Sequence, residues 1–542
     1  MAALLDVFGF LAVLLRGICL ALQSLLIGGT VFLLWTRRNY AAGTTESGFA
    51  RKLLMGGAVG MVIAQVFWLS VNSALLQSTT GIRWPDVFGA EFFLAGLIEL
   101  AGAALIILIC FRSRMPGRYI LLAASALILL GSVLTSHSAA RLNHRGILMA
   151  VTGGHQLGAA IWIGGLPFLL WSLVHVENSA ERARITSNFT RQAITGVALL
   201  VASGVALALV YIPSLKLFYG TAYGVMTTAK VILLCLLLFL GARNNRLIAR
   251  KLVDGAWRLR LRRFTEAEIG IGFTTLLAAA SLTSQPPAID TQASRVTAST
   301  ILTRFAPAIP SMKTPALAEL SPVTPRSADE ARAWGRSPLD TVVPGTGPTH
   351  PDKLSDIEWS EYNHNWAGLI VLVAGILAFV SRFKWGKWAR HWPLAFIGLA
   401  VFLLLRADSE NWPLGPHGFW ESFSVAEVAQ HRVFVVLIVL FAIFEWSVQT
   451  GRLQSRKAAL VFPAVCAAGG TLLLAHNHSL TKVQEELLAE LSHVPIAILG
   501  LVAGWARWLE IRFPDRPPKW AANVWPLCFI GIGYFLLTYR EH

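Results

Sequence analysis

Histidine is the residue of this sequence whose number and spacing most clearly allow chemistry. The chain has 13 histidines, and several fall within residues 136–166, SHSAARLNHRGILMAVTGGHQLGAAIWIGGL. His137 ends one apolar run, His144 lies in the short gap that follows, and His155 lies inside the next run. Imidazole is a common ligand of copper, zinc and haem iron. These histidines are a candidate metal site; the alternative is that they cap helix ends or bind interfacial water.

A second set of histidines occurs in the last third of the chain, again where apolar runs begin or end. His364, His431 and His493 each open an apolar run, and the pair His476 and His478 closes another. Residues at i and i+2 do not share a helix face, so the His-x-His pair suits a turn. The set is a second candidate metal site, and a polar interfacial cluster is the alternative.

The elements that must position these histidines are transmembrane helices. Hydrophobic residues make up 55% of the chain, charged residues only 14%, and the mean hydropathy is +0.58. Apolar runs of about 20 residues, the length that crosses a bilayer, recur throughout. We therefore expect an all-α polytopic membrane protein with about fourteen transmembrane helices. The predicted spans are residues 8–35, 53–75, 88–111, 119–137, 147–171, 192–213, 223–242, 265–284, 364–381, 392–406, 431–448, 458–475, 492–509 and 522–539.

The distribution of positive charge predicts the orientation of these spans. The net charge is +16, and Lys and Arg concentrate in alternate loops, most densely between residues 243 and 263. The positive-inside rule places those loops in the cytoplasm and both termini outside. Every histidine except His175 and His391 then lies on the outer side. The positive charge thus indicates topology, and it does not indicate nucleic-acid binding. The first ten residues contain no Lys or Arg, so the first span is expected to be retained.

The chain divides into three parts by composition. Residues 1–287 are expected to form an eight-helix membrane domain. Residues 288–362 are rich in Pro, Ser and Thr and are expected to be a periplasmic linker or cap. Residues 363–542 are expected to form a six-helix membrane domain that carries the second set of histidines on its outer face. All 5 cysteines fall inside apolar runs, and no CxxC pair signals a disulfide framework or a thiolate metal motif.

Some ionisable residues lie inside predicted spans, where a charge is costly and marks a candidate functional site. These candidates for a transport path are Arg16, Glu91, Glu99 and Lys230. The structural alternative is that Glu99 pairs with Arg16 or with Lys230. Glu266 and Glu268, near the inner end of their span, are expected to pair with the Arg258–Arg263 run.

Several motifs of the first half resemble one family. They are SHSAA at His137, HQLGAAIWIGGL from His155, TAYGVMTTAK at residues 221–230, LGARNN from residue 240, FTEAEIGIG from residue 264 and LAAASLTSQPPA from residue 277. In this order they resemble the copper resistance D family of bacterial inner-membrane proteins over much of residues 8–287. The resemblance implies copper handling at the inner membrane, with a small periplasmic copper-binding partner. It matches His137 and His155 to family histidines. The last six spans resemble an extension present in some members.

The sequence leads to one preferred hypothesis and two alternatives. The preferred one is copper transport or delivery, with copper captured by periplasmic-face histidines in a multi-pass inner-membrane protein. The first alternative is a membrane oxidoreductase that binds haem b or redox-active copper. The second is a copper-binding assembly or scaffold protein. No P-loop or aspartyl-phosphate motif is present, so any transport is not expected to be driven by ATP hydrolysis in this chain. A transporter is favoured over an enzyme, with a membrane oxidoreductase as the alternative. The expected partners are a copper ion, the periplasmic protein and the lipid bilayer, with no nucleic acid.

Overall fold

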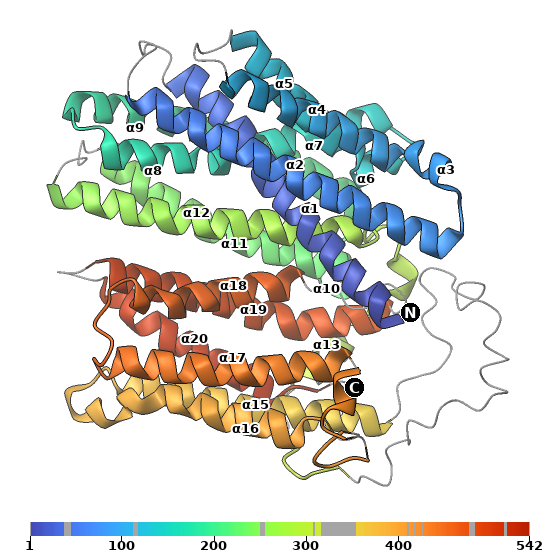
Figure 1. Ribbon diagram of the computed structural model, residues 1–542, viewed down its shortest axis with the longest axis vertical. Helices are drawn as coiled ribbons and strands as arrows, with labels where there is room; N and C mark the ends of the chain where they lie inside the picture. The colour runs from blue at the N-terminus through green and yellow to red at the C-terminus, as the bar shows by residue number, and fades with distance from the viewer. Residues whose placement is uncertain are drawn as a thin grey trace. The chain divides into compact units, whose positions relative to one another are not determined.

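A helix lies at each predicted span in the computed structural model of this chain (Figure 1). The structure describes residues 2–36, 45–111, 118–249, 255–306, 309–315, 354–408, 411–416, 418–424, 426–475, 483–513 and 518–540. Among these residues, 12 helices are long and apolar enough to cross a membrane, and the described elements include no strand. The predicted all-α polytopic fold is confirmed. Two further predicted spans correspond to shorter apolar helices, Arg118–Leu134 and Ala458–Leu474, so the count of fourteen stays a prediction.

Contacts divide the chain into two compact units. The first comprises Met1–Phe218, Met226–Ala293 and Ala475–Asn477; the second comprises Tyr219–Val225, Ser294–Leu474 and His478–His542. The helices of the first part of the chain are α1 (Ala2–Val31), η1 (Phe32–Thr36), α2 (Thr45–Thr80), α3 (Trp84–Phe88), α4 (Glu91–Phe111), α5 (Arg118–Leu134), α6 (His137–Ala140), α7 (Arg145–Ala159), η2 (Ala160–Gly164), α8 (Leu166–His175), α9 (Ser179–Tyr211), α10 (Leu215–Gly220), α11 (Ala222–Ala249) and α12 (Gly255–Ser284).

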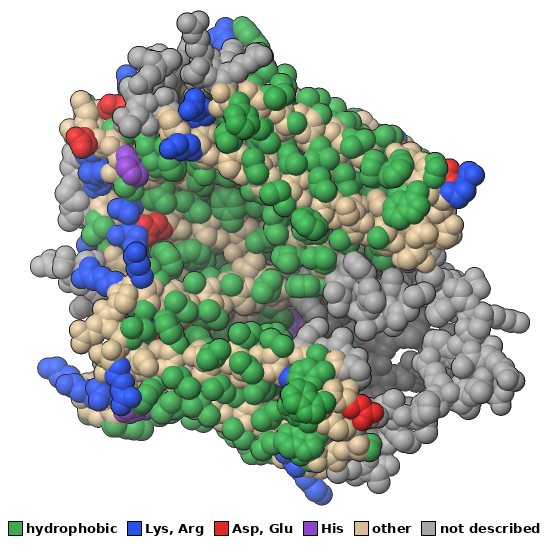
Figure 2. Space-filling view, viewed as in Figure 1, with side chains coloured by type: hydrophobic (Ala, Val, Ile, Leu, Met, Phe, Trp, Pro, Cys, Tyr) green, Lys and Arg blue, Asp and Glu red, His purple; other side chains and the backbone are tan. Residues whose placement is uncertain are grey.

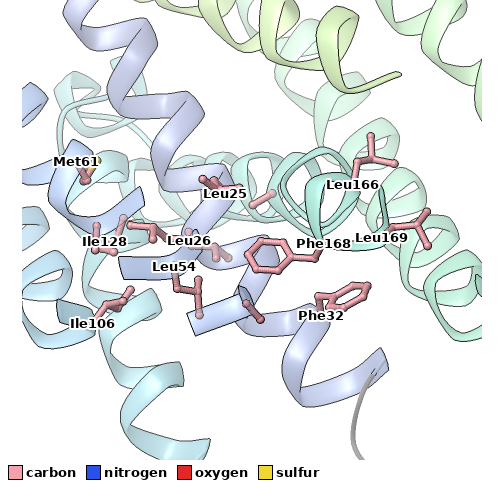
Figure 3. Packing of buried hydrophobic residues seen from close by; sticks show 14 of the residues in the cluster. Leu25, Leu26, Phe32, Leu54, Met61, Ile106, Ile128, Leu166, Phe168 and Leu169 are labelled. Carbon is pink, nitrogen blue, oxygen red and sulfur yellow. The ribbon is translucent and has the colours of Figure 1, made fainter. Parts of the chain in front are cut away.

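The core of the first unit forms where α1 crosses α2, η2 and α8. Leu26, Leu54 and Phe168 are almost fully buried there and point toward one another (Figure 3). Both η1 and η2 are π-helical, and η2 joins α7 to α8 within one apolar span. A side chain at Gly164 would collide with the Ser24 backbone of α1. Small residues therefore let these helices approach closely.

The second part of the chain contains η3 (Gln292–Ser294), α13 (Ala298–Phe305), α15 (Leu354–Val380), η6 (Lys384–Leu394), α16 (Ala395–Arg406), η7 (Glu421–Ser424), α17 (Ala426–Gln449), η8 (Ala458–Leu460), α18 (Val461–Ala475), α19 (Val483–Arg512) and α20 (Lys519–Leu537). Its core is aromatic. The rings of Trp392, Phe462 and Trp525 have centroids 5.5–5.8 Å apart. Glycines at 368 and 533 bring α15 and α20 into backbone contact. Aromatic rings and glycine crossings thus hold this unit together.

Part of the predicted linker is ordered against the second unit. The Ser311 amide donates to Asn365 Oδ1 at 2.5 Å, and the Trp366 indole donates to the Met312 carbonyl at 3.2 Å. Arg406 donates to the Thr314 hydroxyl. Residues 316–353 of the predicted linker lie outside the described residues. The start of the segment is therefore bound to α15 and α16.

The surface agrees with helices that face lipid. Hydrophobic side chains cover the visible flanks of the helices, whereas Lys and Arg gather near helix ends (Figure 2). In the first unit, Ile63, Phe67 and Leu209 are each more than half exposed. A helix that is apolar on all sides is expected where one face meets the core and another meets the bilayer. Which helix ends face the cytoplasm remains the prediction made from the loops.

Candidate functional site

His137 begins the short helix α6 and is held against α12. Its Nε2 lies 3.2 Å from the Leu282 carbonyl oxygen, which can only accept, so Nε2 carries the proton. Burial lowers the pKa of His137 from its usual 6.5. The Leu282 carbonyl and Asp290 oppose this change, while the positive charge of Arg141 adds to it. The neutral ring therefore has its proton on Nε2 and a lone pair on Nδ1 at neutral pH.

A polar network surrounds α6 and fixes the stretch that carries His137. The Ser138 hydroxyl lies 2.6 Å from the Thr152 hydroxyl and 3.0 Å from the Tyr211 hydroxyl, which ties α6 to α7 and α9. Arg141 forms a bidentate ion pair with Asp290, at 3.1 and 2.7 Å. Planar bidentate pairs fix orientation as well as distance. Contacts with α7, with α9 and with the turn that contains Asp290 therefore fix the position of α6 and of His137.

His155 lies in α7 and is held by α9. Its Nδ1 donates to the Leu200 carbonyl at 3.1 Å and lies 3.4 Å from the Ser203 hydroxyl. Gly204 gives the ring its space, because a Cβ there would lie 3.1 Å from the His155 Cε1. The Lys230 ammonium of α11 is close enough to interact electrostatically with the ring. Because Nδ1 donates to this carbonyl, Nε2 of His155 carries the lone pair, and its role toward metal stays a prediction.

His144 differs from its two neighbours in sequence. It has φ 55°, and it is the one non-glycine residue with positive φ among the described residues. Its side chain is exposed, and its carbonyl accepts from Leu148 as α7 begins. Histidine is among the residue types enriched in this left-handed conformation. The structure thus shows a local backbone role for His144, and its role toward metal stays a prediction.

The ionisable residues predicted inside the spans are partly brought together. Arg16 and Glu99 form a buried ion pair at 3.4 Å, which confirms one of the two predicted pairings. Arg16 also donates to the Thr135 hydroxyl at 2.6 Å and to the Ser132 carbonyl at 3.2 Å. Glu91 is exposed at the start of α4 and pairs with Arg145 at 3.5 Å.

The prediction that Glu266 and Glu268 pair with the arginine run is confirmed for Glu266 and wrong for Glu268. Arg262 and Arg263 pair with Glu266, at 3.4 and 2.5 Å. Glu268 accepts a hydrogen bond from Asn244 of α11 at 2.5 Å. Residues two apart on a helix point in different directions, so the adjacent arginines reach only one of the two glutamates.

In the second unit, His364 of α15 and His493 of α19 come together. Their ring centroids lie 6.5 Å apart, and the Tyr539 ring stacks on His364 at 4.0 Å. His364 Nδ1 donates to the Ser360 carbonyl at 2.8 Å, so its Nε2 has the lone pair. One ion with metal–nitrogen bonds of about 2 Å could reach both rings after a small rotation.

His431 forms a second arrangement suited to a metal. Its Nδ1 lies 2.7 Å from Asp408 Oδ1, and the Asp408 side chain is only 7% exposed. Arg432 lies 3.8 Å from the other Asp408 oxygen and donates to the Leu404 and Trp412 carbonyls. A carboxylate behind a histidine fixes the tautomer and raises the basicity of the other nitrogen.

The two remaining predicted ligands, His476 and His478, lie outside the described residues. Within the part of the chain that the structure describes, no three His, Cys, Asp or Glu side chains converge on one point. The candidate sites are therefore single or paired imidazoles with one nitrogen anchored. A complete coordination sphere is not formed by the described side chains alone.

Sequence reasoning missed the groups that hold these histidines. Asp408 follows directly after the apolar part of α16, and His431 opens the next span, so their proximity in consecutive helices was a usable signal. Tyr539, Asp290 and the Leu200 carbonyl carried no such signal. Their approach depends on how distant helices rotate and pack.

Comparison with known proteins agrees with the sequence motifs. Residues 183–282 match the family model described as Copper resistance protein D. The chain is 24% identical over 298 residues to the Copper transport protein CutJ of Bacillus subtilis (strain 168), an alignment covering 50% of this chain and 52% of that protein. The chain thus spans about half the length of the curated relative it matches. No solved structure matches. The expected resemblance to the copper resistance D family is confirmed over residues 183–282, in a chain that has many helices long and apolar enough to cross a membrane.

Proposed function

We propose that this protein transports or delivers copper at the bacterial inner membrane, and that periplasmic-face histidines capture the ion. One observation carries the proposal. The carbonyl groups that anchor His137 and His155 belong to Leu282 and Leu200, and both lie in residues 183–282, which match the copper resistance family. The family-like segment therefore supplies the scaffold that orients both candidate ligands.

The anchored rings are suited to copper. Imidazole binds copper well, and a ring whose second nitrogen donates to a fixed carbonyl has a defined tautomer and direction. His137 presents Nδ1 and His155 presents Nε2, each without the cost of first losing a proton. Backbone motion, a partner protein or the outer residue His144 would complete the coordination sphere.

The six-helix part supplies a second capture site in this proposal. His364, His431 and His493 are its described ligands, with His476 and His478 as further predicted ligands. The Asp408 carboxylate behind His431 fixes the orientation of that imidazole. A copper ion would pass between such sites by exchanging imidazole ligands.

The route into the membrane would pass the buried polar groups of the first unit. Arg16 and Glu99 are paired there, and Lys230 lies near His155. A copper ion that bound Glu99 would have to compete with the Arg16 guanidinium. Glu91, exposed and paired with Arg145, would lie at the entrance. We infer that these charges set which ions enter, since unpaired charge at this depth is costly.

A haem or redox-copper protein remains the second candidate. The observation in its favour is the pair His364 and His493, since two imidazoles from different helices also suit axial ligation of a haem iron.

Metal and spectral analysis of the purified full chain tests the proposal. We expect wild type to retain copper, and we expect His137→Ala with His155→Ala to lose the copper bound by the first unit. His175→Ala is the matched control, because His175 stacks on Trp171 and is assigned to the opposite face. A Soret band that depends on His364 and His493 would favour the haem candidate. Absence of copper from wild type protein after reconstitution would favour a scaffold.

A further inference from the structure

A cavity of about 350 Å³ in the first unit has no role in the copper proposal. It lies between η2, α9, α11 and α12. Its walls are mostly apolar and include Trp162, Phe189, Ile194, Val197, Leu238 and Ile248. Ile194 is 57% exposed, so the cavity opens on a surface that the membrane is expected to cover. Small-molecule sites are commonly apolar cavities with a few polar groups, and this one has such groups.

The polar side chains that line the cavity are Thr190, Asn244, Asn245 and Glu268, and two of them, Asn244 and Glu268, are hydrogen-bonded to each other. Asn244 Nδ2 donates to Glu268 Oε2 at 2.5 Å, and the Trp162 indole also hydrogen-bonds the Glu268 side chain. Asn244 is only 6% exposed, yet its Oδ1 has no hydrogen-bond partner among the described residues. A buried amide oxygen without a donor costs free energy unless a ligand supplies one. Asn244 is among the residues that line the cavity, so its unsatisfied amide oxygen is a candidate acceptor for a molecule that enters it.

Gly241 keeps the polar end of the cavity open. A Cβ at this position would lie 3.2 Å from Glu268 Oε1 and 3.6 Å from the Trp162 ring. Gly241 and Asn244 come from the LGARNN motif, and Glu268 comes from FTEAEIGIG. Both motifs contributed to the family resemblance, but neither supplies a copper-ligand candidate. Their shared position on one cavity gives them a common role.

We propose that this cavity binds a lipid-soluble hydroquinone. A phenolic hydroxyl would donate to Asn244 Oδ1. The flat ring would pack against the rings of Trp162 and Phe189. The apolar tail would lie along Ile194 and Val197 toward the bilayer. None of the residues that line the cavity is Lys or Arg, so a phospholipid phosphate finds no charge partner there. The proposal concerns binding alone and is independent of copper.

The test uses the full chain in phosphatidylcholine nanodiscs and titrates decyl-hydroquinone, kept reduced, by calorimetry. Wild type is expected to bind it saturably and to bind the oxidised quinone more weakly, because the quinone has no hydroxyl to donate. Asn244→Leu is expected to weaken binding about tenfold, the size of one lost hydrogen bond. Gly241→Leu fills the polar end of the cavity and is expected to abolish binding, because its side chain would occupy the space beside Glu268 and Trp162. Phe239→Leu, on an exposed part of α11, is the control and is expected to bind normally.

Each contrary result has a definite meaning. Equal affinity of all variants, or no saturable binding by wild type, would overturn the proposal. A phospholipid that co-purifies with wild type and is released by Gly241→Leu would assign the cavity to lipid instead. If Asn244→Leu does not fold, Gly241→Leu alone decides the outcome. Unchanged hydroquinone binding by the His137→Ala/His155→Ala variant would show that the site is separate from the copper site.

Discussion

Hydrogen bonds to one ring nitrogen decide what each candidate histidine can do. His155, His137 and His364 each donate to a backbone carbonyl, and His431 faces a carboxylate. The acceptor fixes the tautomer and aims the other nitrogen. Each of these histidines is therefore a candidate ligand for two reasons: it has an imidazole ring, and a hydrogen bond holds that ring in a defined orientation.

The support of His155 can be tested without removing the ring. Gly204→Ala would place a Cβ 3.1 Å from the His155 Cε1 and push the imidazole off its bond to Leu200. We expect copper affinity to fall about 10–100-fold, the usual effect of disturbing the groups behind a ligand. Competition titration with a chelator measures this. Gly154→Ala, whose Cβ makes only an ordinary 3.5 Å contact, should keep wild-type affinity.

His137 should make stability depend on pH. Burial lowers the pKa of its folded form below 6.5, so the unfolded chain takes up this proton first as pH falls. Stability is then complete above about pH 6.5 and decreases below it. We expect the thermal midpoint to fall between about pH 7.5 and pH 5.5, and His137→Gln to reduce that slope. His144→Gln is the comparison; an equal reduction there would contradict the assignment to His137.

The Arg16–Glu99 pair allows a double-mutant cycle. Arg16→Met or Glu99→Leu alone leaves a buried charge without its partner and should destabilise by about 3–5 kcal/mol. The double variant should recover most of that loss, because no uncompensated charge remains. Denaturant unfolding in detergent measures all four proteins. Strictly additive losses would mean that the pair is not coupled.

These residues show how far the sequence could predict contacts. Depth along predicted spans was enough to suggest the Arg16–Glu99 pair. Depth alone could not tell that Glu266 contacts the arginines whereas Glu268 contacts Asn244. It also did not predict that Asp408 lies beside His431. Contacts across helices depend on rotation about each helix axis, and helices that are apolar on all sides give no pattern that fixes this rotation.

At the scale of elements, hydropathy located the helices well. Every predicted span contains a helix, because the bilayer sets both the length and the composition of such segments. The π-helical segments η1 and η2 were not predicted. At η2, Gly164 lies against the Ser24 backbone of α1, a tertiary contact that no local pattern records.

Glycine replacement tests the crossing of α1 and η2. Gly164→Ala would drive a methyl group into the Ser24 backbone, and we expect it to destabilise the protein by about 1–3 kcal/mol or prevent folding. Gly56→Ala, in α2, meets no atom within 4 Å and should be neutral or slightly stabilising. Thermal unfolding followed by size-exclusion chromatography compares the two. If both substitutions lowered the thermal midpoint equally, the close contact between Gly164 and α1 would not contribute to stability.

At the scale of the whole molecule, the orientation rests on loop charge and is open to direct test. A cysteine at Asp86 should react with a membrane-impermeant maleimide added outside the cell. A cysteine at Arg452 should react only after permeabilisation, because the charge pattern places its loop in the cytoplasm. Wild type, with its 5 native cysteines, gives the background. The reverse labelling pattern would invert the predicted topology and move the histidines to the inner side.

Asn365 connects two distant places in the chain. It accepts from the Ser311 amide and donates to the carbonyls of Leu536 and Tyr539. One buried amide therefore fastens both the segment before α15 and the segment after α20. Loss of this side chain would release two parts of the chain that are distant in sequence at the same time.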